Sequence, residues 1–406
     1  MQDYFIGRQP IVNTNQDIFA YELLYRDSLK NFVTVNDNRF ATSQTIINLF
    51  ERFGIENVIG DYLGFLNLSG DYILSETIEL IPKEKFVIEI LEGFSSVDKL
   101  ITKVLQLKDK GYIFSLDDFV YKKSYHDFTP VINYIDYIKI DVRLADRVEI
   151  AKRMDILYKI SDKLIAEKVE TKEDFEFFKH LGFKYFQGYF FERPTILKTK
   201  DLEPNQVGVI KLLNLLNSYA SIKKVKELFE AMPDITLRLI KFINSAAFGL
   251  KQKINSINQA INLIGYNRLK IWLLILTYAD KQNIKKSPVF QTAVIRGKQL
   301  EILSENFKDI DKDSAFLVGI LSLIDVVIQK PKEELFEQIN IDDLIKNAVL
   351  FKEGKIGTML LALELDEKND YLVLIETLSN LGISMETFVE SKLKSYAWLQ
   401  SLLKDI

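Results

Sequence analysis

Polar residues that can hold a metal ion or a phosphate stand at the ends of six short apolar runs in the first half of the chain. These runs are Tyr21-Glu22, Phe65-Leu66-Asn67, Val87-Ile88-Glu89, Phe114-Ser115-Leu116-Asp117-Asp118, Ile138-Lys139-Ile140-Asp141 and Leu164-Ile165-Ala166-Glu167. A solvated surface has no reason to place acids so regularly after apolar strands. In a ring of strands, by contrast, the strand ends share one mouth, so acids placed there converge on one site.

The oxygen donors in this set suit a hard divalent cation. Glu22, Asn67, Glu89 and Asp117 offer three carboxylates and one amide from four different runs, and Asp118 adds a fifth donor. Mg²⁺ prefers carboxylate and carbonyl oxygens. Two such cations held close together can ready a water for in-line attack on a phosphodiester. The pattern therefore indicates metal-dependent phosphodiester chemistry.

Neighbouring residues can complete such a site. Lys139 can stabilise developing phosphoryl charge or hold the attacking water, and Arg26 can clamp a phosphate. Glu167 can ligate a cation or orient the site. Each residue alone has a structural alternative: a strand-end Glu is more often a salt-bridge partner, and Asp117-Asp118 also suits a helix-capping turn. Only the whole set favours a site over these alternatives.

Composition limits the classes of protein that fit. A chain of 406 residues is too long for one ordinary core, so two domains are expected. The net charge of −4 offers no global basic field, so we expect neither DNA nor RNA as a partner. The absence of cysteine removes disulfides, thiolate zinc sites and cysteine nucleophiles, and fits a reducing cytoplasm. Without a signal peptide or an apolar stretch of roughly 20 residues, we expect a cytoplasmic protein with no membrane partner.

Short β-rich runs alternate with helical stretches up to about residue 195. The predicted strands are 5–12, 18–25, 62–68, 85–90, 112–116, 137–140, 163–166 and 185–191, and the predicted helices are 42–53, 96–110, 147–161 and 172–181. Strand–helix–strand repetition is typical of a parallel sheet. About eight strands in this length favour a compact, TIM-like β/α barrel over an open sheet.

The pattern changes after Arg193-Pro194 and becomes almost purely helical. The predicted helices are 207–216, 222–232, 235–243, 257–263, 268–278, 293–306, 315–328, 341–350, 355–365 and 385–403. Asp234 and Ser256 are expected to cap the helices that follow them, and Gly265 is expected to end one. We therefore predict two domains, a β/α barrel over 1–195 and a helical domain over 196–406, an α/β fold joined to an all-α fold.

A series of short motifs in the first half resembles the EAL-domain family, cyclic di-GMP phosphodiesterases built on a β/α barrel. The motifs are Gln9-Pro10-Ile11, Tyr21-Glu22-Leu23-Leu24-Tyr25-Arg26 (with Leu23 in place of alanine), Phe65-Leu66-Asn67-Leu68-Ser69, Glu89-Ile90-Leu91-Glu92, Asp117-Asp118-Phe119, Lys139-Ile140-Asp141, Ala166-Glu167-Lys168-Val169-Glu170-Thr171 and Phe186-Gln187-Gly188-Tyr189. They cover nearly all of residues 4–195, in the family's order.

The resemblance implies a role for each matching residue. Metal binding would fall to Glu22, Asn67, Glu89 and Asp117, with Asp118 completing a centre of two Mg²⁺ or Mn²⁺ ions. Assistance at the water or the metal would fall to Lys139, Glu167 and Gln187. Substrate contacts would fall to Arg26 and Gln9, and Glu92 would brace the loop after the Asp pair. The implied reaction opens cyclic di-GMP to linear pGpG.

The second half resembles the HDOD domain, a relative of HD metal phosphohydrolases that lacks their metal site. The matching stretches are Asn244-Ser245-Ala246-Ala247-Phe248-Gly249, Ile254-Asn255-Ser256-Ile257, Ala260-Ile261-Asn262-Leu263-Ile264-Gly265 and Ala315-Phe316-Leu317-Val318-Gly319-Ile320-Leu321. Ser322-Leu323 stands where the HD pair would fall, and both histidines of the chain, His126 and His180, precede residue 200. HD-type hydrolysis is therefore not expected. Asn244-Ser245 either binds a partner or joins one helix to the next segment, and the second reading is preferred.

Two functions remain open at this point. The first is a phosphodiesterase with a non-catalytic HDOD signalling module that contacts a protein partner. The second is a catalytically weak or inactive cyclic di-GMP receptor or adaptor acting through protein contacts. The family usually has two glycines in the loop after the Asp pair, and the segment Phe119-Val120-Tyr121-Lys122-Lys123-Ser124-Tyr125 has neither. This difference motivates the second function and also bears on a possible homodimer.

Overall fold

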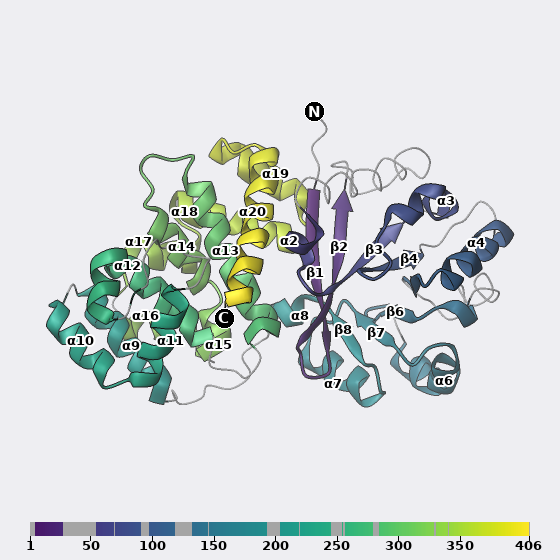
Figure 1. The fold of residues 1–406 in the computed structure, drawn as a ribbon, viewed down its shortest axis with the longest axis horizontal. Coiled ribbons are helices and arrows are strands. Elements are labelled where there is room, and N and C mark those ends of the chain that lie inside the picture. The colour runs from purple at the N-terminus through teal and green to yellow at the C-terminus, as the bar shows by residue number, and fades with distance from the viewer. Residues whose placement is uncertain are drawn as a thin grey trace. The chain divides into compact units, whose positions relative to one another are not determined.

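The computed structural model describes residues 5–26, 54–68, 70–90, 97–117, 132–144, 146–192, 204–218, 220–244, 254, 256–278, 284–328, 330–339 and 341–405 (Figure 1). The chain divides into two compact units, Met1–Pro194 and Thr195–Ile406. The first is an α/β barrel and the second is helical, which confirms the predicted fold class.

Eight strands close into a barrel in sequence order. They are β1 (Phe5–Asn13), β2 (Ile18–Arg26), β3 (Leu63–Leu68), β4 (Phe86–Ile90), β5 (Ile113–Leu116), β6 (Tyr137–Asp141), β7 (Leu164–Glu167) and β8 (Tyr185–Gln187). Strands β2 to β8 are parallel to their neighbours. Their carboxyl ends therefore meet at one mouth of the barrel.

The first strand departs from the prediction of an all-parallel sheet, because β1 is antiparallel to both β2 and β8. Only four residues separate β1 from β2, too few for the crossover that parallel strands require. The side chain of Asn13 closes this turn by accepting hydrogen bonds from the backbone nitrogens of Asn15 and Asp17 at 2.8 and 3.0 Å. Gln16 takes the positive φ of 64° that such a turn needs.

Helices follow most of the parallel strands on the outside of the barrel (Figure 1). They are α2 (Ile55–Ile59), α3 (Gly70–Leu74), α4 (Val97–Asp109), α6 (Arg147–Ile160), α7 (Lys172–His180) and α8 (Tyr189–Glu192), with 3-10 turns at Glu76–Leu80 and Ile132–Tyr134. Asp146 caps α6 through the backbone nitrogens of Val148 and Glu149, and Thr171 caps α7 through that of Asp174. The predicted helix over 42–53 lies outside the described residues.

The last predicted strand, 185–191, is wrong in its second half. Strand β8 ends at Gln187, and helix α8 begins at Tyr189. Between them Gly188 has φ +149°, and a Cβ there would lie 2.3 Å from the backbone of Val169. Only glycine permits this close approach, and it turns the chain out of the sheet.

The second unit is built from helices. They are α9 (Pro204–Asn217), α10 (Ile222–Glu230), α11 (Pro233–Ile243), α12 (Ile257–Tyr278), α13 (Pro288–Ser304), α14 (Lys312–Leu321), α15 (Ile324–Ile328), α16 (Lys332–Gln338), α17 (Asp343–Phe351), α18 (Gly354–Glu367), α19 (Tyr371–Leu381) and α20 (Met385–Asp405), with a 3-10 turn at Ile284–Lys286. Its buried residues include Trp272, which is 1% exposed. Trp272 is therefore a core residue, as its apolar surroundings predicted.

Several boundaries in this unit follow from single residues. Ser256 accepts a hydrogen bond from the backbone nitrogen of Gln259 at 3.3 Å, as a capping residue does. Gly265, at φ +74°, breaks α12 into two segments. Asp234 does not cap α11, because that helix already begins at Pro233, a residue suited to a first helical position.

Two features of the helical pattern were not predicted. The helix expected over 315–328 is two helices, α14 and α15, separated at Ser322-Leu323. Helices α16 and α19 were missed altogether. Within the described ranges, no single helix combines enough length with enough apolar character to cross a membrane, and the pair Tyr371–Leu381 and Met385–Lys404, bent by 102°, meets the criteria only as a pair.

Candidate functional site

The candidate residues form one layer inside the barrel, directly above an apolar layer. The apolar layer comprises Ile11, Ala20, Phe65, Val87, Tyr137 and Ile165, with Phe19, Leu63, Ile113 and Tyr185 packed against it. Alternate strand residues point to the same side of a sheet. Two positions further along the same strands stand Glu22, Asn67, Glu89, Lys139, Glu167 and Gln187. The apolar layer thus closes the barrel below the polar layer.

Lys139 is the centre of the polar layer. Its ammonium lies 2.6 Å from Glu167 Oε1, 2.8 Å from Glu89 Oε1, 3.1 Å from Glu22 Oε2 and 3.3 Å from Asp117 Oδ1. The Lys139 side chain is 0% exposed, and the four carboxylates are at most 14% exposed. Five strands, or the residue just after one, therefore bring their charges to a single buried point.

Two amides hold Glu22 in place. Asn67 Nδ2 donates to Glu22 Oε1 at 2.7 Å, and Gln187 Nε2 donates to Glu22 Oε2 at 2.6 Å. The same nitrogen of Gln187 donates to Gln9 Oε1 at 2.8 Å. Gln9 stands opposite Glu22 in the β1–β2 register. The antiparallel first strand thus contributes to the site through Gln9.

The protonation of this layer reflects burial and crowding. Burial raises the pKa of Glu89 well above its usual range, against the opposing effect of Lys139. Burial likewise raises the pKa of Glu167 to about 8. For Lys139, burial opposes the charged form, but the surrounding carboxylates dominate and raise its pKa well above the ordinary value. The ammonium therefore stays charged while the carboxylates compete for it.

Several buried oxygens in this layer have no hydrogen-bond partner. They are Asn67 Oδ1, both Glu89 oxygens, Glu167 Oε2 and Gln187 Oε1. Glu89 meets Lys139 only as an ion pair without an aligned hydrogen bond. Leaving buried polar atoms unpartnered costs free energy, and a hard divalent cation would satisfy carboxylate and amide oxygens of this kind.

The donor set fits divalent cations, although the carboxylates are drawn to the ammonium. Among the residues that the structure describes, no three acidic or histidine side chains form a ready-made metal-ligand group. The four carboxylates instead gather around Lys139. They outnumber it, so the layer retains an excess of negative charge and unpartnered oxygens for an added cation.

Some of the candidate residues lie partly or wholly outside the described part of the chain. Asp118 and Glu92 are among the undescribed residues, as are His126 and the loop after Asp118. Arg26 ends β2 and stands opposite Phe5 in the register, but its side chain is not described. The structure therefore brings together Glu22, Asn67, Glu89, Asp117, Lys139, Glu167, Gln187 and Gln9.

Two further residues belong to this region and had no proposed role. Ser115 is buried in the barrel, opposite Glu89 in the β4–β5 register, and its hydroxyl has no hydrogen-bond partner. Asp141, at the end of β6, receives a hydrogen bond from Lys168 Nζ at 2.7 Å. Hydrogen bonds from Arg143 and Lys168 outweigh burial and lower the pKa of Asp141. Asp141 was noted as a strand-end acid, and its spacing of two from Lys139 signals that it shares the same side of β6.

Comparison with known families agrees with this architecture. Residues 7–194 match the EAL domain, and residues 206–358 match the HDOD domain. The protein YuxH of Bacillus subtilis (strain 168) is 33% identical over 98% of this chain and 98% of its own length. The chain therefore belongs to the family of proteins that join an EAL domain to an HDOD domain.

Other relatives cover one or both halves of the chain. A protein of Vibrio cholerae named cyclic di-GMP phosphodiesterase CdgJ is 29% identical over 99% of this chain and 94% of its own length. Among solved structures, an EAL domain protein from Listeria monocytogenes EGD-e is 22% identical, with a TM-score of 0.37, and covers 47% of this chain and 88% of its own.

Proposed function

We propose that the chain is a phosphodiesterase that hydrolyses cyclic di-GMP to linear pGpG with two divalent cations, Mg²⁺ or Mn²⁺. The observation that carries this proposal is the buried layer in which four carboxylates outnumber one ammonium. The relative CdgJ, whose name states this activity, supports the choice of substrate. Glu22, Asn67, Glu89 and Asp117 would hold the cations, together with Asp118.

The reaction adds water across one phosphodiester bond. A water oxygen bonds to phosphorus, the bond from phosphorus to the 3′ oxygen breaks, and that oxygen leaves with a proton. The phosphate stays on the 5′ oxygen, which makes the product pGpG. When bound, the cations would polarise the phosphate and lower the pKa of a coordinated water.

The residues of the chain have separate tasks in this scheme. The Lys139 ammonium, held charged by its neighbours, stabilises negative charge that develops on the phosphoryl oxygens or holds the attacking water. Glu167 contacts Lys139 at 2.6 Å and fixes its position. Gln187 fixes Glu22 through a hydrogen bond of 2.6 Å. Arg26 and Gln9 would contact the substrate.

The apolar layer below the site also has a task. Phe65, Val87 and Ile165 are 0% exposed and lie two residues before Asn67, Glu89 and Glu167 on their strands. They seal the barrel beneath the carboxylates, so the charges face only the mouth. In such a water-poor setting, charge–charge interactions are stronger than in solution.

The helical unit would act as a non-catalytic signalling module with a protein partner. The sequence has no histidine after residue 200, so an HD-type metal centre has no ligands there. In the HDOD part, Asn244 bonds the backbone of Ile254 from both ends of its amide, at 2.6 Å each. This supports the joining role for Asn244 rather than the binding of a partner.

Product analysis of cyclic di-GMP incubated with the full chain tests the proposal. With Mn²⁺ or Mg²⁺ we expect pGpG to accumulate, and chelation with EDTA should stop its formation. If cyclic di-GMP binds, as measured by calorimetry, but no linear product forms with either metal, the protein is instead a receptor or adaptor. Absence of both binding and product would reject the nucleotide as a ligand.

A further inference from the structure

Four parts of the helical unit enclose a cavity of about 130 Å³. Helix α12 contributes Asn267, Lys270 and Leu274, at spacings of three and four, so one face of the helix after the Gly265 break lines the space. Helix α9 contributes Leu213, and α14 contributes Leu317 and Leu321. A cavity of roughly 150 Å³ in an apolar core can bind benzene, so this space fits a ligand of about that size.

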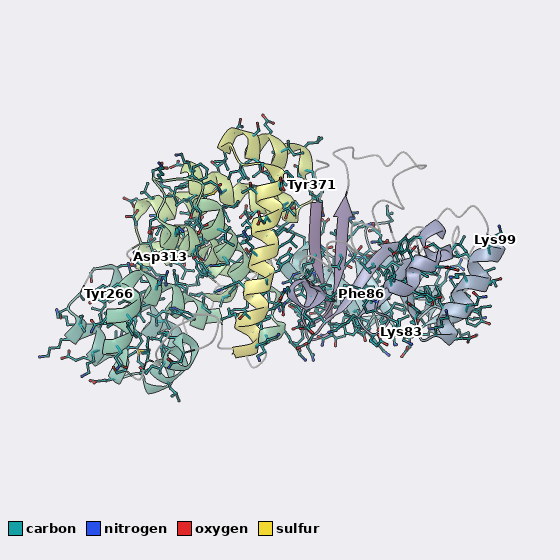
Figure 2. The ribbon with its side chains drawn as sticks, turned by 45° about the horizontal axis from the view of Figure 1, so that its top comes forward. Lys83, Phe86, Lys99, Tyr266, Asp313 and Tyr371 are labelled. Atoms are coloured by element: carbon teal, nitrogen blue, oxygen red, sulfur yellow. The ribbon has the colours of Figure 1, made fainter. Side chains whose placement is uncertain are left out.

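The cavity has a defined edge. Tyr266 and Asp313, labelled in Figure 2, stand next in sequence to the lining residues Asn267 and Ser314. Arg268 lies 3.8 Å from Asp313 and links α12 to α14. The Tyr266 hydroxyl donates to the backbone oxygen of Ala220 at 2.7 Å. These contacts fix the start of the lining face of α12.

A buried ammonium is the chemical feature of this cavity. Lys270 is 8% exposed, and its Nζ donates to Asn267 Oδ1, a neutral oxygen, at 3.3 Å. Burial lowers the pKa of Lys270, and the charge of Asp342 opposes this effect. A Leu or Met at this position would pack against the neighbouring leucines without the desolvation cost of a charge. The lysine therefore has a purpose other than packing.

We propose that this cavity binds a small organic monocarboxylate, with the carboxylate on Lys270 and an apolar body against Leu213, Leu317 and Leu321. One ammonium matches one negative charge. Asp342, an exposed lining residue, repels a second negative charge, so a phosphate monoester with a charge of about −1.5 to −2 is disfavoured. The site lies within the helical unit and does not depend on the activity of the barrel.

Titration of the full chain with paired probes tests the charge requirement without any mutation. Benzoate and hexanoate are compared with benzyl alcohol and hexanol by calorimetry, and phenyl phosphate is added as a dianionic probe. We expect the carboxylates to bind about 10- to 100-fold more tightly than the alcohols, since hydrogen bonds to a charged group carry that difference. Equal affinity of acid and alcohol, tighter binding of phenyl phosphate, or no binding of either carboxylate at millimolar concentration would overturn the proposal.

Variants then locate the binding site. Lys270→Met should weaken benzoate binding by about 10- to 100-fold while leaving the melting temperature unchanged or higher. The matched control is Lys285→Met, at an exposed lysine of the same unit, which should bind benzoate like the wild type. Leu317→Phe, which fills the cavity, should weaken benzoate and benzyl alcohol together. Benzoate binding that survives both Lys270→Met and Leu317→Phe would place the ligand elsewhere and refute the assignment.

Discussion

Two clusters of buried charge, one in each unit, differ in how completely their atoms are satisfied. In the barrel, one ammonium, that of Lys139, faces four carboxylates. In the helical unit, Arg296 donates to Glu367 Oε1 at 2.8 Å and to Ser322 Oγ at 2.9 Å, and it lies 3.6 Å from Glu364. Lys352 donates to the same Glu364 at 3.0 Å. The second cluster therefore has two cations for two carboxylates.

The hydrogen-bond inventories point the same way. Within the described part of the chain, no buried side-chain atom of the Arg296 cluster lacks a hydrogen-bond partner, whereas four residues of the Lys139 layer hold unpartnered oxygens. A balanced, hydrogen-bonded cluster stabilises a particular packing of helices. A layer with surplus oxygens is costly until something binds to it. The comparison thus separates a structural cluster from a binding site by its stoichiometry.

The largest effect should come from Glu22→Gln, which removes one charge from the layer. We expect hydrolysis of cyclic di-GMP to fall at least about 10³-fold, since a catalytic cation supplies several kcal/mol of charge stabilisation. The measurement is pGpG formed per minute, by chromatography. Glu367→Gln makes the same chemical change in the balanced cluster and should lower thermal stability but leave the rate of the folded protein within about threefold. Equal losses in the two variants would contradict the distinction between the clusters.

Removal of the central cation should affect the two clusters in different ways. Without metal, Lys139→Met and Arg296→Met should each lower the free energy of unfolding of their unit by about 3–5 kcal/mol, since each leaves buried carboxylates unpaired. Added Mg²⁺ or Mn²⁺ should restore part of the loss in Lys139→Met only. Urea unfolding with and without the metal measures this difference. Restoration of Arg296→Met by the same metal would show that surplus oxygens are not what attracts the cation.

The metal-free barrel should lose stability as the pH rises through the range set by Glu167. The pKa of this group in the folded state is raised from 4.5 to about 8, so the folded state holds its proton more tightly than the unfolded state. Its contribution is fully present below about pH 4.5 and is lost by about pH 8, with a slope of at most about 1.4 kcal/mol per pH unit. Urea midpoints across this range, compared with those of Glu167→Gln, isolate the effect. An unchanged slope in Glu167→Gln would assign it to another group.

The smallest effect should come from Gln187→Ala, which removes the hydrogen bond that orients Glu22. We expect the concentration of Mn²⁺ needed for half-maximal activity to rise about tenfold, as for other groups that position a metal ligand. Gln299→Ala is the control, since Gln299 is also buried and its amide donates to Ser391 in the helical unit. A lower maximal rate without any change in the metal requirement would mean that Gln187 acts on the substrate instead.

Much of the barrel could be predicted from local sequence. The apolar runs before Glu22, Asn67, Glu89 and Glu167 predicted strands whose bounds differ from those observed by one or two residues at most. Alternation along a strand also predicted which residues share a side. The orientation of the first strand was missed, although Asn13 and the four residues after it hold a turn signal. The end of the last strand was missed because only the approach of Gly188 to Val169 shows that a glycine is required there.

In the helical unit, the sequence predicted many helices but not the polar interior. Arg296 is a charged residue within a helix, and its spacing gives no sign that it is 2% exposed. Its partners Ser322 and Glu367 lie 26 and 71 residues away. Lys270 is similar, since its role depends on a cavity formed by four helices. Periodicity describes one helix at a time and carries no information on such partners.

The sequence alone thus determined the kind of each domain and the residues that end at the barrel mouth, because strand alternation and strand ends are local properties. The tertiary structure alone decided that the four carboxylates meet one ammonium, that their layer retains unpartnered oxygens, and that Lys270 faces a cavity. These features depend on contacts between segments distant in the chain. The balance of charge and hydrogen bonds at such contacts exists only once the chain has folded.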